Sequence, residues 1–114
     1  MYLGINNLQF VDQRAFQRIN SDLKGRFLLS NGEEYDCLVK VISPGGLCAF
    51  CDANNIIIGE IITVLIDEIG RIKGKVINFD DKRGYVIQII ASENTKRKLA
   101  EKIMLIANKD DIEF

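Results

Sequence analysis

The chain has 114 residues, of which 47% are hydrophobic and 27% are charged, and its formal net charge is −1. This length suits one domain with a single modest core. The composition argues against a disordered chain and against general nucleic-acid binding, which normally needs a basic excess. No apolar run reaches the length of roughly 18 to 20 residues that spans a bilayer. The N-terminal stretch MYLGINNLQF also lacks the basic start and apolar run of a signal peptide. We therefore expect a cytoplasmic protein without membrane insertion.

Residues 1–19 show no clear period and are expected to form a leader that carries Arg14 and Arg18. Two strands follow, KGRFLL and EEYDCLVKVIS, joined by a turn with Asn31-Gly32 at its tip, which is a typical hairpin sequence. In the second strand apolar residues alternate with Asp36 and Lys40. Strict alternation predicts that Lys40 points outward and Val41 inward, whereas a β-bulge before the following corner would turn Val41 outward; the sequence leaves both arrangements open.

The stretch Ser43-Pro44-Gly45-Gly46 contains the only proline of the chain. Proline presets φ at the second position of a tight turn, and glycine accepts positive φ at the third. A plain hairpin explains such a corner, and so does a ligand that must approach bare backbone. The turn sequence alone leaves both explanations open.

The next strand, GLCAFC, contains Cys48 and Cys51, and the third cysteine is Cys37. An odd number of cysteines without an export signal indicates reduced thiols. The CxxC spacing suggests a redox or zinc site, but there is no second CxxC and no histidine. In a strand, residues three apart point to opposite faces. We therefore expect structural cysteines and no metal site.

A second hairpin combines IITVLID, a turn at residues 68–70 and RIKGKVINF, in which basic and apolar residues alternate. After a turn at residues 80–84, YVIQII forms a further strand. About six short antiparallel strands without an intervening helix favour a small barrel or sandwich over residues 20–91.

The last segment changes to a helical period, with Ser92 as N-cap and an apolar stripe of Leu99, Ile103 and Ile106. We expect a helix over residues 92–109, packed on the barrel or on a partner, and an acidic tail over residues 110–114. The run Lys96-Arg97-Lys98 suggests nucleic-acid binding, but the acidic residues nearby favour a solvated helix face. We expect no DNA or RNA partner.

Arginine stacks on flat bases and forms forked hydrogen bonds to phosphate or to the guanine edge. Two surface arginines in a polar leader are the simpler interpretation of Arg14 and Arg18. However, the order R14-A-F-Q-R18, then V41-I-S-P-G-G46, then a hairpin, resembles the PilZ family. The stretches G59–G74 and T95–N108 also look like its small single-domain alphaproteobacterial members.

The resemblance covers about residues 13 to 108 and implies a six-stranded antiparallel PilZ-type β-barrel with a C-terminal α-helix. It also implies a receptor for the bacterial second messenger cyclic di-GMP that passes its signal to a protein partner. By position, Arg14 and Arg18 would hold phosphates and guanine, Ser43 would contact the ligand, and Gly46 would let it approach the backbone. No cofactor other than this ligand is implied, and a homodimer is left open.

The sequence departs from the family motif at Val41, where the family usually has Asp or Asn. Valine offers no acceptor for the guanine N1–H and N2–H₂ groups. Losing one such bond costs roughly 1–3 kcal/mol, or roughly tenfold to a hundredfold in affinity. We therefore expect weakened cyclic di-GMP binding. The alternative is a degenerate PilZ domain that binds no nucleotide and serves as a protein-interaction module.

An enzyme is the third possibility, for instance a CxxC oxidoreductase. The chain has no histidine, no clustered carboxylates and no P-loop, and so offers few catalytic groups. We expect no enzymatic activity.

Overall fold

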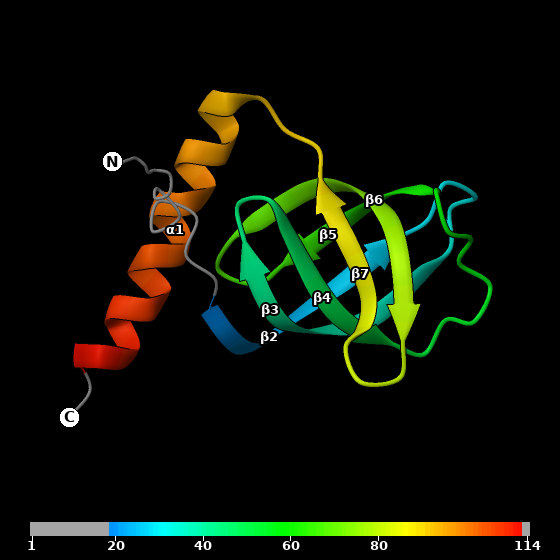
Figure 1. Ribbon diagram of the computed structural model, residues 1–114, viewed down its shortest axis with the longest axis horizontal. Coiled ribbons are helices and arrows are strands. Elements are labelled where there is room, and N and C mark those ends of the chain that lie inside the picture. The colour runs from blue at the N-terminus through cyan, green and yellow to red at the C-terminus, as the bar shows by residue number, and fades with distance from the viewer. Residues whose placement is uncertain (1–18, 113–114) are drawn as a thin grey trace, which may run out of the picture.

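The computed structural model describes the backbone of residues 19–112 and the side chains of residues 19–107. Over this range the chain forms a closed antiparallel barrel with the strand order β2-β3-β4-β7-β6-β5, followed by a C-terminal helix (Figure 1). The elements are β2 (Ile19–Leu28), β3 (Glu34–Ser43), β4 (Gly46–Cys51), β5 (Ile61–Ile66), β6 (Gly70–Asp80), β7 (Gly84–Ile89) and α1 (Glu93–Ile112). The structure confirms the expected six-stranded barrel with a C-terminal helix.

Two elements extend one to three residues beyond the ranges expected from the sequence. Ile19, expected in the leader, is the first residue of β2. The helix continues to Ile112, so residues 110–112, expected in an acidic tail, are helical. In both cases regular backbone hydrogen bonding continues beyond the point where the apolar pattern of the sequence fades.

The barrel interior is filled by the inward-facing residues of all six strands. Phe27, Val39, Ile42, Val64, Val76 and Ile87 are completely buried. Phe27 and Tyr85 meet edge to face with ring centroids 6.0 Å apart, and the Tyr85 hydroxyl donates to the Ala53 carbonyl at 2.7 Å. Burial of this apolar surface is the main force that holds the sheet closed.

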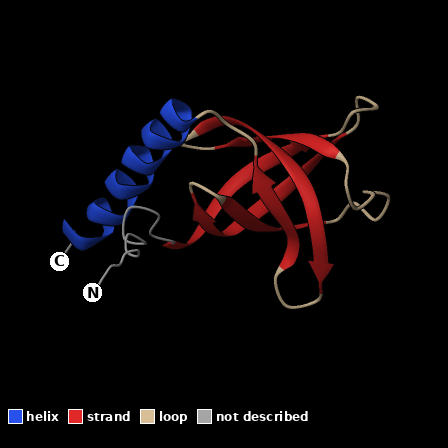
Figure 2. Ribbon diagram, turned by 45° about the horizontal axis from the view of Figure 1, so that its top comes forward, coloured by secondary structure: helices blue, strands red, loops and turns tan. Residues whose placement is uncertain are grey.

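Helix α1 lies at one end of the barrel, where the β3–β4 turn also points (Figures 1 and 2). Its start is fixed by Ser92, whose Oγ accepts a hydrogen bond from the Thr95 backbone N–H at 3.1 Å. Leu99 and Ile103 are buried and belong to the same core as the barrel. The helix therefore covers this end of the core, as its apolar stripe predicts.

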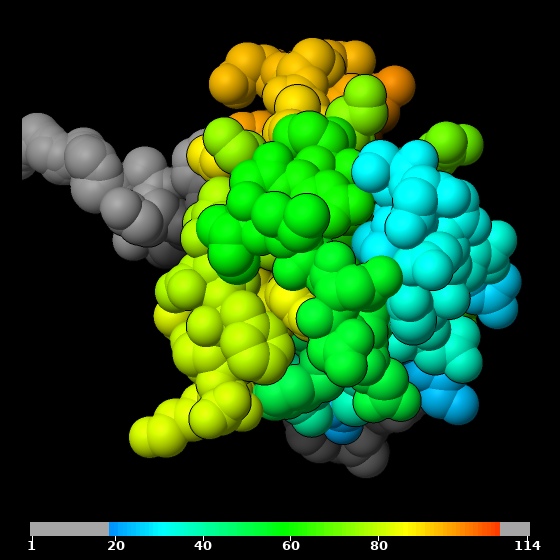
Figure 3. Space-filling view, turned by 90° about the vertical axis from the view of Figure 1, so that its right-hand side faces the viewer, coloured from blue at the N-terminus to red at the C-terminus, as the bar shows by residue number. Residues whose placement is uncertain are grey.

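The opposite end of the barrel carries the loop of residues 52–60 and the hairpin turns at residues 29–33 and 81–83 (Figure 3). The loop is hydrogen-bonded to β6, since the Gly59 N–H donates to the Val76 carbonyl at 2.6 Å. Within residues 19–112, no helix has both the length and the apolar character that a bilayer span requires.

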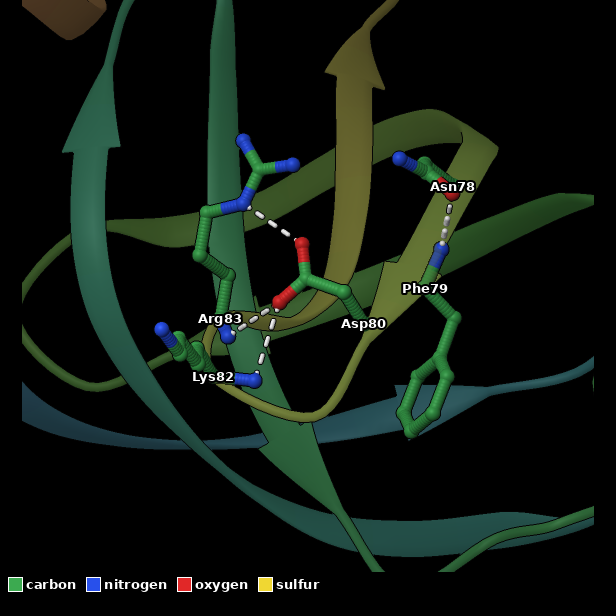
Figure 4. A network of polar contacts seen from close by, with 5 residues as sticks. All are labelled: Asn78, Phe79, Asp80, Lys82 and Arg83. Atoms are coloured by element: carbon green, nitrogen blue, oxygen red, sulfur yellow. Dashed lines mark hydrogen bonds and ion pairs between the residues drawn. The ribbon is translucent and has the colours of Figure 1, made fainter.

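The β6–β7 turn is held by one carboxylate. Asp80 Oδ1 accepts the backbone N–H groups of Lys82 and Arg83 at 2.9 and 2.7 Å, and Asp80 Oδ2 accepts Arg83 Nε at 2.7 Å (Figure 4). The backbone N–H and the guanidinium of Arg83 together hold the pKa of Asp80 below its usual value. Gly84 follows with φ of 77°, and a Cβ there would lie 2.4 Å from the Ala49 carbonyl oxygen. Only glycine fits at this position.

Candidate functional site

Strand β3 does not alternate from end to end. Val39 pairs with Ala49, but Val41 pairs with Cys48, so β3 has one extra residue, Lys40, at this point. Such a β-bulge exchanges the two faces of all residues that follow it. Val39 and Ile42, three residues apart, are both completely buried in the core. The expectation that Val41 points inward is therefore wrong, and Val41 is half-buried on the outer face together with Ser43.

The neighbouring strand supports this irregularity. The β2–β3 register also shifts, between Asn20 and Leu23. In that interval the Ser21 hydroxyl donates to the Val39 carbonyl at 2.8 Å, and Asp22 forms an ion pair with Lys40. The Val39 carbonyl, which precedes the extra residue, and the side chain of Lys40 are thus both bonded to β2. The bulge is a fixed feature of this sheet.

The corner at Ser43–Gly46 is a tight hairpin turn that is bonded to β7. Ser43 pairs with Gly46, and the Ser43 hydroxyl donates to the Gly46 carbonyl at 3.3 Å. The Gly45 carbonyl accepts the Ile89 N–H at 3.0 Å, and Pro44 is completely buried. The Ser43 oxygen retains lone pairs that are available to a further donor.

The two glycines of the corner differ in what they require. Neither has positive φ, so the turn itself does not demand glycine. A Cβ at Gly46 would lie 2.9 Å from the Ile87 carbonyl oxygen, whereas a Cβ at Gly45 would meet nothing within 4 Å. Gly46 is thus needed for the close packing of β4 on β7. Gly45 leaves exposed backbone at the tip.

Two rows of cross-strand neighbours form the outer surface beside this corner. The first row runs Asn20, Val41, Cys48, Val86 and Asn78 across strands β2, β3, β4, β7 and β6. The second row runs Ser43, Gly46, Gln88 and Lys75. Directly paired residues have Cβ atoms about 4.5–5.5 Å apart. Val41 therefore has an exposed amide, Asn20, as its immediate neighbour, and Gly46 has another, Gln88.

Arg83 is an exposed cation in the β6–β7 turn. Its hydrogen bond and ion pair with Asp80 raise its pKa. Cys48 is buried although it is on the outer face of the barrel. The two arginines that the sequence singled out, Arg14 and Arg18, lie outside the described residues.

The CxxC cysteines point to opposite faces, as the strand geometry predicts. Cys48 pairs with the outward Val41, whereas Cys51 pairs with Cys37, which belongs to the core. Burial raises the pKa of Cys37 to about 12 and also raises that of Cys51. Thiols with raised pKa values are poor nucleophiles at neutral pH. Among the side chains of residues 19–107, no cluster of His, Cys, Asp or Glu could hold a metal ion.

A surface hollow over β2, β3, β4 and β5 lies away from the corner. Its rim mixes Lys24 and Arg26 with three carboxylates, those of Asp36, Asp52 and Asp67. Arg26 already forms ion pairs with Glu34 and Asp36. Because both signs of charge are interspersed, this hollow does not favour an anionic ligand.

Comparison with known proteins identifies the family that this barrel represents. A family model described as the PilZ domain matches residues 12–105. The chain belongs to the PilZ family. PilZ domains are non-enzymatic receptors of cyclic di-GMP. No curated protein matches this chain.

Solved structures share the fold at low sequence identity. The PilZ domain with c-di-GMP of YcgR from Escherichia coli matches at 15% identity and a TM-score of 0.63, over 86% of this chain and 93% of that one. The MrkH–c-di-GMP complex from K. pneumonia matches at 20% identity and a TM-score of 0.62, over 84% of this chain and 52% of that one. The inhibitor of motility MotI/DgrA from Bacillus subtilis matches at 18% identity and a TM-score of 0.59, over 82% of this chain and 51% of that one. This PilZ chain spans about half the length of the MrkH and MotI/DgrA chains.

Two polar residues beside the corner were missed by the sequence analysis. Asn20 and Gln88 lie next to Val41 and Gly46 only because of the strand register, and the β2–β3 register itself shifts at Asn20. Neither residue lies in a motif. Their positions follow from pairing between strands that are distant in sequence, which a single sequence does not specify.

Proposed function

We propose that this PilZ domain binds cyclic di-GMP at the outer face of the Ser43–Gly46 corner and passes the signal to a protein partner. One observation carries the proposal: the bulge at Lys40 puts position 41 and Ser43 on the same outer face. The motif requires this arrangement, whereas strict alternation would have put Val41 in the core. The exposed backbone at Gly45 gives a phosphate or sugar room to lie against the turn.

Arg14 and Arg18 remain the proposed phosphate and guanine ligands. Two phosphates need cations, and guanidinium groups also stack on guanine and bond its N7/O6 edge. They precede β2, the strand whose Asn20 lies beside Val41. A leader that closes over the ligand when it binds is a disorder-to-order switch of the kind that a partner protein can sense.

We propose that Asn20 partly replaces the acceptor that Val41 lacks. Its exposed amide is directly opposite Val41 on the same face. An amide oxygen accepts N–H donors such as those of the guanine edge. The affinity is then weakened by less than the full loss of one hydrogen bond, which is roughly tenfold to a hundredfold.

Calorimetric titration with cyclic di-GMP tests the proposal. Wild type is expected to bind, Arg14→Ala to lose binding, and Val41→Asn to bind more tightly, by less than the roughly tenfold to hundredfold that one full hydrogen bond contributes. Arg97→Ala removes an exposed arginine from α1 and is the matched control, with unchanged affinity expected. Absence of heat with wild type at tens of micromolar protein would reject cyclic di-GMP binding.

A double-mutant cycle tests the role of Asn20. Asn20→Ala is expected to weaken binding in the wild-type background and to have little effect in the Val41→Asn background, because one amide then serves the same guanine donors. Equal effects of Asn20→Ala in both backgrounds would show that Asn20 does not replace the missing acceptor.

The second candidate is a degenerate PilZ domain that binds proteins without nucleotide. The observation that favours it is the half-buried apolar side chain of Val41 on the face where the family usually has Asp or Asn. A partner interaction that is unchanged by cyclic di-GMP and by Arg14→Ala/Arg18→Ala would support this candidate. Loss of the interaction in either case would support the receptor.

The cytoplasm is the proposed location, and the partner protein is unidentified. The kinship to the small single-domain alphaproteobacterial members is part of the same proposal, supported by the stretches G59–G74 and T95–N108. Sedimentation of the protein with and without cyclic di-GMP measures whether it forms a homodimer.

A further inference from the structure

A cleft with four cations lies where helix α1 meets strand β6. Arg71 and Lys73 project outward from β6, and Lys98 and Lys102 lie one turn apart on α1. All four line the same cavity of about 170 Å³. Two separate elements, distant in sequence, thus bring two positive charges each to one small space.

Among the residues that the structure describes, no carboxylate balances these charges within the cleft. Its described lining residues include no Asp or Glu. The ion pairs within residues 19–107 involve Arg26, Lys40 and Arg83, so none of the four cleft cations takes part. In a chain whose net charge is −1, this is a local excess of positive charge.

The floor of the cleft strengthens its electrostatic field. It is formed by buried isoleucine and leucine side chains, among them Ile72, Ile89 and Leu99. Charges beside an apolar wall are screened less than charges in open water. Lys102 is also held in place, because its Nζ donates to the Ile69 carbonyl at 2.9 Å.

We propose that this cleft is a second ligand site, selective for a phosphate-type dianion. Four cations around a small cavity favour a compact, multiply charged oxyanion, which interacts with both sides at once, over a single carboxylate. Thr95 adds a hydroxyl to the lining. A bound phosphate group connects α1 to β6 and holds the helix against the barrel.

The cleft is distinct from the Ser43–Gly46 corner, although the two share a boundary. The connection from β7 to α1 separates them: the Ile89 N–H bonds the Gly45 carbonyl on one side, and the Ile90 N–H bonds the Lys73 carbonyl at 2.9 Å on the other. Neither Ser43 nor Gly46 lines the cleft.

NMR titration of the ¹⁵N-labelled full chain tests the site. Inorganic phosphate and pyrophosphate are added at constant ionic strength with sodium chloride. We expect saturable shifts at the amides of residues 71–73 and 95–102, and tighter binding of pyrophosphate. The Lys73→Gln/Lys98→Gln variant is expected to bind roughly tenfold or more weakly. The matched control Lys24→Gln/Lys82→Gln removes two exposed lysines from elsewhere and is expected to bind as wild type.

The phosphate group that binds in the cleft can belong to a lipid headgroup or to a soluble molecule, and vesicle sedimentation distinguishes these two sources. Binding to phosphatidic acid vesicles, but not to phosphatidylcholine, that is lost in Lys73→Gln/Lys98→Gln identifies a lipid headgroup. Phosphate binding in solution without vesicle binding identifies a free or soluble phosphate.

Three results would overturn the proposal. Shifts that grow without saturation, or that are equal in both double variants, would mean general screening of surface charge. Displacement of phosphate from the cleft by cyclic di-GMP would mean that the cleft belongs to the nucleotide site. The phosphate titration and the vesicle assay do not depend on whether cyclic di-GMP binds, so their failure is distinguishable from failure of the proposed function.

Discussion

The two faces of the β3–β4 hairpin differ in the burial of their side chains and in the role that we assign to them. On the inner face, Val39, Ile42, Leu47 and Ala49 are at most 2% exposed and fill the barrel. On the outer face, Val41 and Ser43 are half-buried; Val41 is paired with the exposed Asn20, and Ser43 with Gly46, whose other neighbour is the exposed Gln88. The inner face determines stability, whereas the outer face holds the proposed ligand site.

One residue decides which face each side chain occupies. Without the bulge at Lys40, Val41 and Ser43 would lie inside and Ile42 outside. A single inserted position thus converts a plain packed strand into one that presents a motif. The predictions below separate the two faces, from the largest expected effect to the smallest.

Deletion of Lys40 tests the bulge itself. It returns β3 to strict alternation and forces either Ile42 out of the core or the corner out of register. We expect a loss of about 5 kcal/mol or more in the free energy of unfolding, enough to unfold a domain of ordinary stability. Circular dichroism with urea measures it. Deletion of Asn54, an exposed loop residue, is the control and should be tolerated.

Ile42→Ala tests the inner face. Ile42 is completely buried, and its truncation leaves a cavity, so we expect a loss of about 2–5 kcal/mol in the free energy of unfolding. Val41→Ala, its half-buried outer neighbour, should cost clearly less. Equal losses in urea denaturation would contradict the assignment of the two residues to different faces.

Ser21→Ala tests the support of the bulge by β2. The variant leaves the Val39 carbonyl without its 2.8 Å side-chain donor. We expect a loss of about 1 kcal/mol in the free energy of unfolding. The Ser21→Thr variant keeps the hydroxyl and should retain most of the wild-type free energy of unfolding. A wild-type value for Ser21→Ala would show that the bond contributes little.

Titration of Cys37, a core residue, is expected to make the free energy of unfolding depend on pH. Its folded-state pKa is about 12, above the usual value of 9.0, because burial disfavours the thiolate. Above pH 9 the unfolded chain loses this proton while the folded chain keeps it, so stability falls as pH rises from 9 to 12. Urea midpoints at pH 7 and pH 10.5 should differ less in Cys37→Ala than in wild type. An unchanged difference would show that Cys37 does not titrate as described.

Much of the fold could be predicted from sequence because local signals agree. The hairpin signal Asn31-Gly32, the alternating strands, the proline corner and the Ser92 cap each specify local structure. Their order allows few topologies, of which a small antiparallel barrel is one. The family motifs then identified which barrel to expect.

The outer face could not be predicted in the same way. Lys40 has no property that marks it as an extra residue, since a charged residue is equally suited to a regular outward position. The neighbours Asn20 and Gln88 depend on register between strands that are distant in sequence. The cleft at α1 depends on how the helix packs on β6, which the apolar stripe alone does not determine.

Residue-resolved NMR with cyclic di-GMP tests the central claim most directly. The account predicts saturable amide shifts at Val41, Ser43, Gly45 and Gly46 and at their outer-face neighbours Asn20 and Gln88. Side-chain methyl signals of the inward Val39 and Ile42 should move far less. Saturable binding with shifts confined to another surface, or no shift at any concentration, would contradict the claim that the bulged corner of β3 is the ligand site.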